Sequence, residues 1–196
     1  MSGPYDIRAF ASGQRDSSWI VGNWQVNYIF QARSGQPFNL NVGGDPANIS
    51  GSIGSVTGYA RPNLVGDPFQ AGPVAANPNP ACQKTISQGG LAADKVHSVD
   101  TWFNPCAFAA PSGSFGNLGR NSLRTDKVIN MDFSIFRKVR VSESKEFQLR
   151  AEAFNLFNIM NLGVPSVTTI GQAGAGRITS IVGNPRQLQL GLRFVF

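Results

Sequence analysis

The sequence of 196 residues contains no run of about 18 apolar residues, so it predicts no transmembrane helix. Charged residues make up only 14% of it, well below the quarter or so that is usual in soluble domains. The net charge is +6, but the basic residues are scattered and no nucleic-acid-binding motif is present. Composition therefore argues against a nucleic-acid-binding protein and against an ordinary soluble enzyme, and the length predicts one domain.

The last eleven residues, 186–196, alternate strictly between apolar and polar side chains. Because successive side chains of a strand point to opposite faces, this pattern predicts a strand with one apolar and one polar face. A tilted strand of about 9–11 residues crosses an outer membrane, with its apolar face in lipid. The alternative is the last strand of a soluble β-sandwich. The apolar residues are Leu188, Leu190, Leu192, Phe194 and Phe196.

This ending resembles the C-terminal β-signal of bacterial outer-membrane proteins. The signal has a polar residue, a glycine and two aromatic residues at fixed spacing, which correspond to Gln189, Gly191, Phe194 and Phe196. The resemblance implies that the barrel-assembly machinery recognises these residues.

Three earlier stretches, 22–42, 127–139 and 145–158, alternate in the same way. The break at 34–37 is either a hairpin turn or a bulge within one long strand, and the direction of the following strands favours one kinked strand. Residues 145–160 also have helical propensity, but the alternation outweighs it. The strands predict an all-β fold, in which an antiparallel meander forms an open part of a transmembrane β-barrel with long extracellular loops.

The prediction divides the single domain, residues 1–196, into four parts. Residues 1–21 form a periplasmic connection and 22–42 the kinked strand. Residues 43–126, rich in Gly, Pro, Asn and Ser, form a long structureless extracellular loop. Residues 127–196 form the last three strands, with a tight turn at 140–145 and a second loop at 161–185. Within the loops, 101–108 is expected to be a short helical turn ended by Pro105, and 177–181 a strand extension.

Several segments together resemble the late strands of TonB-dependent receptors of the Oar-like type, which carry a carboxypeptidase-regulatory-like domain. Residues 150–158 are the most distinctive. The resemblance implies an outer-membrane location for the full-length parent, a barrel of about 22 strands with an N-terminal plug, and active uptake of a large or scarce nutrient without enzyme activity. The segments are 22–26 (GNWQV), 31–38 (QARSGQPF), 61–63 (RPN), 102–104 (WFN), 115–121 (FGNLGRN), 130–134 (NMDFS), 150–158 (RAEAFNLFN) and 186–190 (RQLQL).

Residues 1–8 lack the apolar core of a signal peptide, although an outer-membrane protein must be exported. We therefore expect this chain to be the C-terminal piece of a longer protein. Its expected partners are membrane lipid, the barrel-assembly machinery, the plug and other strands of the receptor, and TonB through the missing N-terminal part; no nucleic acid is expected. The alternative function is a soluble all-β module that binds a glycan through aromatic loop residues.

Cys82 and Cys106 both lie in the long loop. In an exported protein two cysteines predict a disulfide, which could stabilise the fold by ~3 kcal/mol; the alternative is two free thiols in a cytosolic protein. His97 is the only histidine and lies between Asp94 and Asp100, but no nucleophile motif accompanies it. We interpret His97 as a solvated loop residue and expect no catalytic residues, no metal site and no cofactor.

A row of polar residues is expected on the lumen face of the strands: Asp132, Gln148, Arg150 and Glu152. We interpret the row as a structural network in which Arg150 and Glu152 each pair with a residue of a neighbouring strand. Trp24, Phe194 and Phe196 are expected near the periplasmic end, where an aromatic girdle forms in membrane barrels.

Deletion of Phe196 in the full-length parent tests the β-signal. Removing one lipid-facing Phe forfeits only ~1.5–3 kcal/mol of transfer free energy, a small loss for a barrel with a closed ladder of hydrogen bonds. We expect a much larger loss of folded receptor from outer-membrane fractions, and a similar loss for Phe194→Ala. Val195→Thr, on the polar parity, is the control. Near-normal levels of all three variants would show that the ending is strand periodicity alone.

Overall fold

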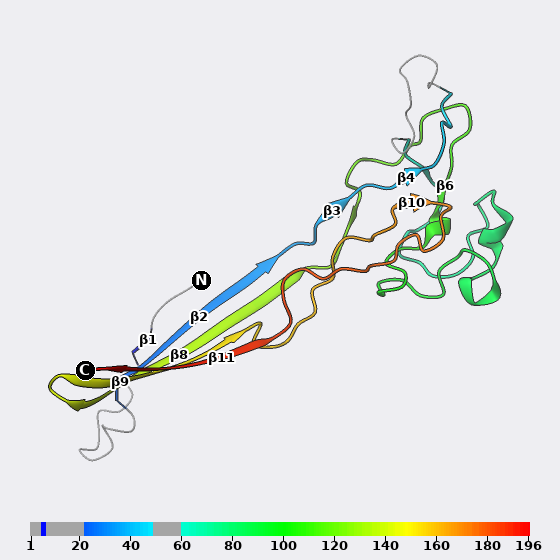
Figure 1. Cartoon of the computed structure of the whole chain (residues 1–196). Helices are drawn as coiled ribbons and strands as arrows, with labels where there is room; N and C mark the ends of the chain where they lie inside the picture. The colour runs from blue at the N-terminus through cyan, green and yellow to red at the C-terminus, as the bar shows by residue number, and fades with distance from the viewer. Residues whose placement is uncertain (1–4, 7–21, 49–59) are drawn as a thin grey trace. The chain divides into compact units, whose positions relative to one another are not determined.

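The computed structural model describes residues 5–6, 22–48 and 60–196 (Figure 1). The chain divides into two compact units. The first, here called the sheet unit, comprises residues 1–34, 127–161 and 182–196, and the second, the loop unit, comprises residues 35–126 and 162–181. In the described ranges no α-helix occurs, and no helix is long and apolar enough to span a bilayer.

The sheet unit is one antiparallel sheet with the strand order β1-β2-β8-β9-β11. Its four long strands follow one another as a meander, as the alternation predicts, and Figure 1 shows them running side by side. The all-β fold class is therefore confirmed, and the sheet is open in the part of the chain that is described. The bounds are β1 Tyr5–Asp6, β2 Trp24–Arg33, β8 Val128–Ser142, β9 Lys145–Phe154 and β11 Gln187–Val195.

The register joins the apolar residues of all four long strands on one side of the sheet. Tyr28 pairs with Phe133, Phe133 with Ala153, and Ala153 with Leu188. Directly opposed residues of antiparallel strands point to the same side, so the apolar parities coincide. This apolar face carries the charged Arg137 and the apolar residues Trp24, Val26, Tyr28, Phe30, Ala32, Ile129, Met131, Phe133, Ile135, Val139, Phe147, Leu149, Ala151, Ala153, Leu188, Leu190, Leu192 and Phe194.

The break at 34–37 is not a hairpin turn, because the residues after it pair with 123–124 and not with β2. Pro37 pairs with Arg124 and Phe38 with Leu123, in the same numerical register as the pairs of β2 with β8, which favours one strand over two. These pairs form the short strands β3, Pro37–Phe38, and β7, Leu123–Arg124. At the break, Gln36 donates its backbone N–H to the Thr125 hydroxyl, and the Thr125 N–H donates to the Gln36 carbonyl.

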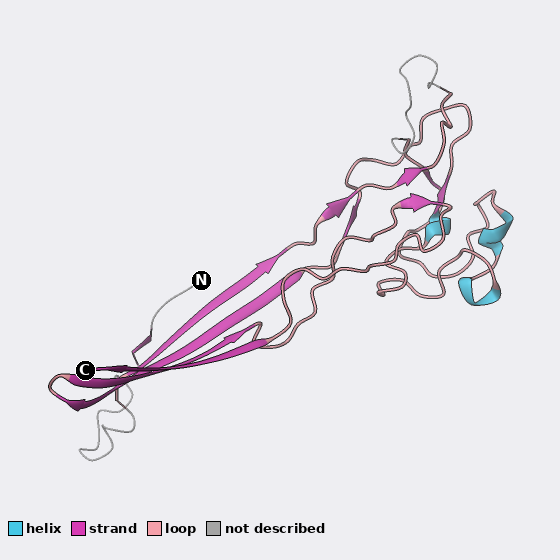
Figure 2. Ribbon diagram, in the orientation of Figure 1, coloured by secondary structure: helices cyan, strands magenta, loops and turns pink. Residues whose placement is uncertain are grey.

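The long loop 43–126 is not structureless, and that expectation is wrong. It packs into the loop unit with two-residue strands and short 3-10 turns, which Figure 2 distinguishes by colour. β4 pairs with β10 in parallel and β5 with β6 antiparallel. The strands are β4 Asn41–Val42, β5 Asn63–Leu64, β6 Phe108–Ala109 and β10 Thr169–Ile170, and the turns are η2 Pro80–Gln83, η3 Ile86–Gln88 and η4 Pro105–Ala107.

A hydrophobic core explains why the loop unit packs without long strands. Phe103 lies at its centre, with its ring 5.8 Å from that of Phe108 and 6.1 Å from that of Phe38. The disulfide Cys82–Cys106, buried beside Ala92, joins positions 24 residues apart with a Cα–Cα distance of 5.4 Å. The expected disulfide is thus present. The buried core is Phe38, Leu40, Trp102, Phe103, Ala107, Phe108, Leu118, Leu123 and Ile178.

In the loop unit, buried asparagine side chains form many of the hydrogen bonds to backbone groups that long paired strands would form elsewhere. The Asn104 side chain, 0% exposed, donates to the carbonyls of Gln70 and Gly72 and accepts from the backbone N–H groups of Ala93 and Cys106. These four bonds use the full donor and acceptor capacity of the amide. The Asn77 amide donates in the same way to Cys106 and Phe108. Each amide therefore connects segments that are far apart in the chain.

Three local expectations differ from the structure. Pro105 begins the turn η4 rather than ending a helical turn, because proline suits the first position, where its missing N–H is not needed. Residues 177–181 form no strand extension; Ile181 makes only an isolated bridge with Leu162. Tyr5–Asp6 pair with Val26 and Gln25 as β1, and the rest of the predicted connection 1–21 lies outside the described residues.

Gly35, in the break at 34–37, should be sensitive to substitution. A Cβ at this position would overlap the backbone carbonyl groups of Thr125 and Asp126, so Gly35→Ala requires a backbone shift and should cost about 1–3 kcal/mol of stability. Gly119→Ala is the matched control, because a Cβ there has nothing within 4 Å. Thermal unfolding of the detergent-folded protein measures both. Equal midpoints of thermal unfolding for the two variants would show that position 35 tolerates a side chain.

Candidate functional site

The polar face of the sheet is the candidate surface for function, because it carries most of the polar side chains of the four long strands. Ser134 pairs with Glu152 and Glu152 with Gln189, so these residues share that face. Apolar exceptions are Ile29, Val128, Phe136, Phe154 and Val195. The polar residues are Gln25, Asn27, Gln31, Arg33, Asn130, Asp132, Ser134, Lys138, Arg140, Glu146, Gln148, Arg150, Glu152, Gln187, Gln189 and Arg193.

The predicted polar row divides into two groups. The Arg150 guanidinium donates to the Glu152 carboxylate at 2.6 Å, and the Gln148 amide donates to the Glu146 carboxylate at 2.5 Å. These bonds run along β9, so the expected pairing of Arg150 and Glu152 across strands is wrong. The Arg150 side chain is 60% exposed, so this ion pair contributes little to stability. Asp132 belongs to a different group.

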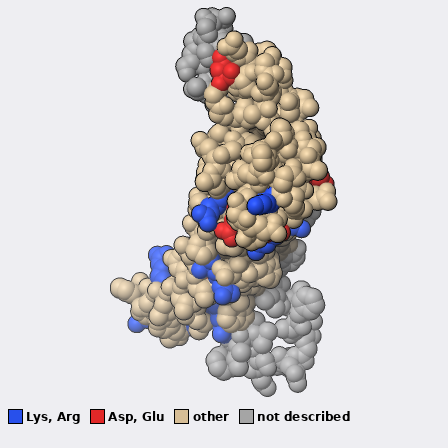
Figure 3. Space-filling model, turned by 90° about the vertical axis from the view of Figure 1, so that its right-hand side faces the viewer, with Lys and Arg blue, Asp and Glu red and all other residues tan. Residues whose placement is uncertain are grey.

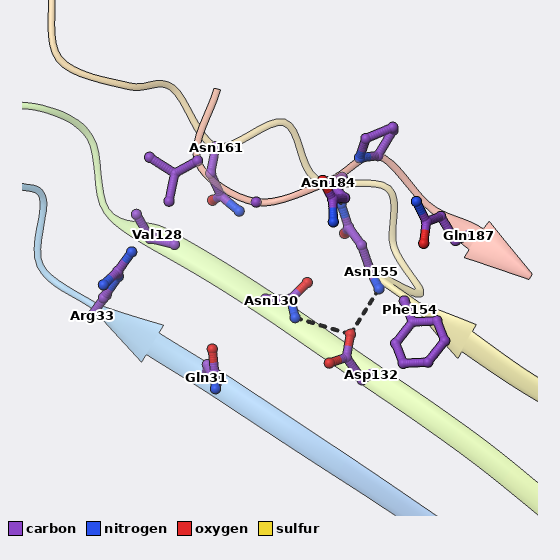
Figure 4. Close-up of a pocket in the computed structure, with 13 residues that line it drawn as sticks. Gln31, Arg33, Val128, Asn130, Asp132, Phe154, Asn155, Asn161, Asn184 and Gln187 are labelled. Carbon is purple, nitrogen blue, oxygen red and sulfur yellow. Dashed lines mark hydrogen bonds between the residues drawn. The ribbon is translucent and has the colours of Figure 1, made fainter. Parts of the chain in front are cut away.

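Asp132 lies in a pocket of about 440 Å³ on the polar face (Figure 4). All lining residues belong to the sheet unit: β2 and β8 supply two walls, and the chain after β9 and before β11 supplies the others. A volume in this range is typical of small-molecule sites. The lining residues are Gln31, Arg33, Val128, Asn130, Asp132, Phe154, Asn155, Asn161, Val182, Gly183, Asn184, Pro185 and Gln187.

The Asp132 carboxylate is held by one of its two oxygens. Oδ1 accepts from the Asn130 amide at 3.0 Å and from the Asn155 backbone N–H at 2.9 Å (Figure 4). Among the described residues, Oδ2 has no hydrogen-bond partner. The carboxylate is therefore fixed in orientation, and its second oxygen remains an acceptor for a ligand.

Asn155 directly follows β9 and begins the turn that lines one side of the pocket. Its φ is 51°, a left-handed conformation that asparagine tolerates better than other non-glycine residues. Its amide donates to the carbonyls of Ile159 and Asn184, and its Oδ1 accepts from the Ile159 N–H. The predicted strand 145–158 therefore stops at Phe154, and the turn joins the segment that leads into β11.

Asn161 completes the pocket wall, and its side-chain amide bonds to β8 as the backbone of a neighbouring strand would. Its Oδ1 accepts from the Ile129 backbone N–H and its Nδ2 donates to the Ile129 carbonyl, both at 2.9 Å. One side chain thereby satisfies both backbone groups of a residue in β8. These two hydrogen bonds fix Asn161, and with it this part of the pocket wall, to β8.

Gln31, Arg33 and Gln187 contribute polar groups that are not used in the fold. Their side chains line the pocket and make no hydrogen bond or ion pair within the described part of the chain. Phe154 adds an aromatic ring, 40% exposed, to this otherwise polar surface. Arg33 and Asp132 are the charged lining residues, so the lining charges balance.

Sequence reasoning found Asp132 but missed the pocket around it. Arg33, Asn155 and Asn161 were not expected to meet Asp132, since they lie in three different segments. One usable signal was present: 150–158 is a distinctive segment in which Phe154 and Asn155 interrupt the alternation. A polar strand face that ends in an aromatic residue and an asparagine indicates a turn rather than more strand.

A second pocket, of about 610 Å³, lies within the loop unit and includes Asp94, Lys95 and Arg177. Asp94 accepts from the Ser87 hydroxyl at 2.5 Å and from the Ser87 N–H at 2.9 Å. The side-chain hydrogen bond from Ser87, followed by one from Thr85, holds the pKa of Asp94 below its usual value. Arg177 is paired with Asp100 at 3.5 Å. The carboxylates of the second pocket, Asp94 and Asp100, are thus bound by other side chains of the protein. The pocket on the polar face is therefore the better candidate for a ligand site.

His97, the predicted solvated histidine, is exposed but held between aromatic rings. Its ring stacks on Phe69 at 4.7 Å and meets Trp102 edge-on at 4.9 Å. In the ranges that the structure describes, no three His, Cys, Asp or Glu side chains are grouped so as to hold a metal ion. On the face drawn in Figure 3, charged side chains form separate groups on a mostly uncharged surface.

Of the β-signal residues, Phe194 lies at the hairpin end of the sheet, Gly191 in the middle of β11 and Gln189 near its start. Phe194 contacts Phe147 with ring centroids 4.7 Å apart and Phe196 at 5.8 Å. At the start of β2, the Arg137 guanidinium lies 4.9 Å from the centre of a Trp24 ring. Gly191 and Gln189 pair with Arg150 and Glu152 on the polar face. Recognition of these residues by an assembly machinery remains a prediction.

Comparison with known proteins places the chain in a family. Residues 2–189 match the family model described as an outer membrane beta barrel domain. No curated protein and no solved structure matches the chain. The match covers nearly all of the sequence and agrees with antiparallel strands that have one apolar and one polar face. The chain belongs to the outer membrane beta barrel domain family.

Proposed function

We propose that the chain is the C-terminal part of the barrel of a TonB-dependent receptor that actively takes up a large or scarce nutrient across the outer membrane. The family supports the barrel, and the resemblance of segments such as 150–158 to Oar-like receptors supports the finer assignment. In this proposal the chain supplies wall and loops, and it carries out no catalytic step.

The observation that carries the proposal is the exposure of the apolar face. Leu188, Leu190 and Leu192 are 74%, 84% and 68% exposed. Each such side chain gains about 1.5–3 kcal/mol when it leaves water. Both buried hydrophobic clusters consist of loop-unit residues, so no core within the described sheet unit covers this face. A lipid bilayer would cover it, with the polar face turned to the barrel interior.

A soluble glycan-binding module fits these observations less well. In a soluble sandwich the apolar faces of two sheets pack against each other about 10 Å apart. The sheet unit forms a single layer, and its family is one of outer-membrane barrels. We therefore do not retain the soluble module.

The proposal assigns a partner to each surface of the sheet unit. Lipid contacts the apolar face, the plug occupies the interior on the polar side, and further strands pair with the two edges of the sheet, on the side of β1 and β2 and on the side of β11. The barrel-assembly machinery recognises Gln189, Gly191, Phe194 and Phe196, and TonB acts through the N-terminal part of the full-length receptor.

The test compares nutrient use in strains of the source bacterium that lack either this gene or TonB. Both should lose growth on the same scarce nutrient, because uptake needs energy delivered by TonB. The gene carrying Gln25→Arg, on the polar face and beside the cross-strand row that contains Leu190, should restore growth. Leu190→Arg should not, since a cation at mid-membrane on the lipid face costs about 2–4 kcal/mol.

Growth on that nutrient without TonB would contradict active uptake. Restoration by both arginine variants, with equal amounts of folded receptor in the outer membrane, would contradict the orientation of the sheet.

A further inference from the structure

We infer that the pocket around Asp132 is a subsite for a neutral polyhydroxylated ligand, such as a sugar unit of an oligosaccharide. The inference rests on the proposed function in one respect: it takes the polar face to be the wall along which the nutrient passes.

The lining chemistry selects hydroxyl groups. Gln31, Asn130 and Gln187 carry side-chain amides, and an amide both donates and accepts hydrogen bonds. A hydroxyl group has the same dual character, whereas a carboxylate or phosphate only accepts and an ammonium group only donates. A ligand with many hydroxyl groups can therefore satisfy this surface without leaving polar atoms unpaired.

The charges of the pocket exclude the strongest alternatives. Arg33 and Asp132 balance each other, so the lining offers no cluster of cations for a polyanion or a negatively charged iron chelate. An apolar ligand would leave the Arg33 guanidinium and the Asp132 carboxylate desolvated, which is costly. A neutral polar ligand can bind to both.

Two groups are prepared for such a ligand. Asp132 Oδ2 has no hydrogen-bond partner among the residues that the structure describes, while Oδ1 is fixed by Asn130 and Asn155, so the carboxylate needs no reorganisation to accept from hydroxyl groups. A charged acceptor makes stronger hydrogen bonds than a neutral one. Phe154, from the end of β9, presents an exposed ring on the same pocket (Figure 4), and the C–H face of a sugar ring can pack on an aromatic ring.

Binding to the full-length receptor in detergent tests the inference. An array of neutral oligosaccharides of glucose, galactose, mannose, xylose and N-acetylglucosamine identifies a binder, and calorimetry then measures its dissociation constant. We expect saturable binding of at least one oligosaccharide that is insensitive to salt, since the ligand is uncharged. Citrate serves as the anionic probe and should not compete.

Two variants test separate contributions of the pocket to binding, the charged acceptor and the aromatic ring. Asp132→Asn can keep the bonds from Asn130 and Asn155 but turns the free acceptor into a donor, and Phe154→Leu removes the ring. Each should weaken binding on the order of tenfold or more, because a hydrogen bond to a charged group or a lost stacking face is worth that much. Glu146→Gln is the matched control: it makes the same chemical change on the polar face, and Gln148 can still donate to the new amide oxygen.

Three results would overturn the inference: no array member binds, citrate binds in a manner abolished by Arg33→Gln, or oligosaccharide binding is unchanged by both pocket variants. The proposed function is judged separately by TonB-dependent growth. Oligosaccharide binding without TonB-dependent uptake would remove the transport proposal and leave the subsite. TonB-dependent uptake by a receptor that binds no oligosaccharide would remove the subsite and leave the transport proposal.

Discussion

The register of four antiparallel strands is the constraint on which the rest of the sheet unit depends. Side chains alternate with period two, so a slip of one residue would move every apolar side chain to the opposite face. The pairs Tyr28 with Phe133, Phe133 with Ala153 and Ala153 with Leu188 keep the apolar parities together across all four strands. The polar parities are then aligned as well, which brings Gln31 opposite Asn130 at the pocket.

Where the strands end, asparagine side chains form the hydrogen bonds to backbone groups that a neighbouring strand would otherwise form. Asn155 and Asn161 fix the wall of the pocket through bonds to backbone groups, and Asn104 does the same inside the loop unit. Asparagine can adopt a positive φ and carries both a donor and an acceptor, so one residue can reverse the chain and satisfy the groups exposed by the reversal. This explains how the loop unit, with only two-residue strands, holds a buried core, and how the sheet unit keeps a pocket wall where its strands end.

The sequence allowed the strands, their faces, the meander and the disulfide to be predicted, because each rests on a local pattern or on there being two cysteines. It did not reveal the core of the loop unit. Phe38, Phe103 and Phe108 have no common period, and they meet only after segments far apart in the chain pack together. The partners of Asp132 were missed for the same reason: its contact with Asn155 depends on where β9 ends, and alternation alone predicted a longer strand.

The central claim is that one face of the sheet unit contacts lipid and the other contacts water inside a barrel. The most direct measurement attaches a nitroxide label at each position from 187 to 194 of the receptor in bilayers, and compares its collisions with oxygen and with a water-soluble nickel chelate. The account predicts strict alternation, with Leu188, Leu190, Leu192 and Phe194 accessible to oxygen and the intervening positions accessible to the chelate. Uniform access of the chelate to all eight positions, or alternation in the opposite phase, would contradict it.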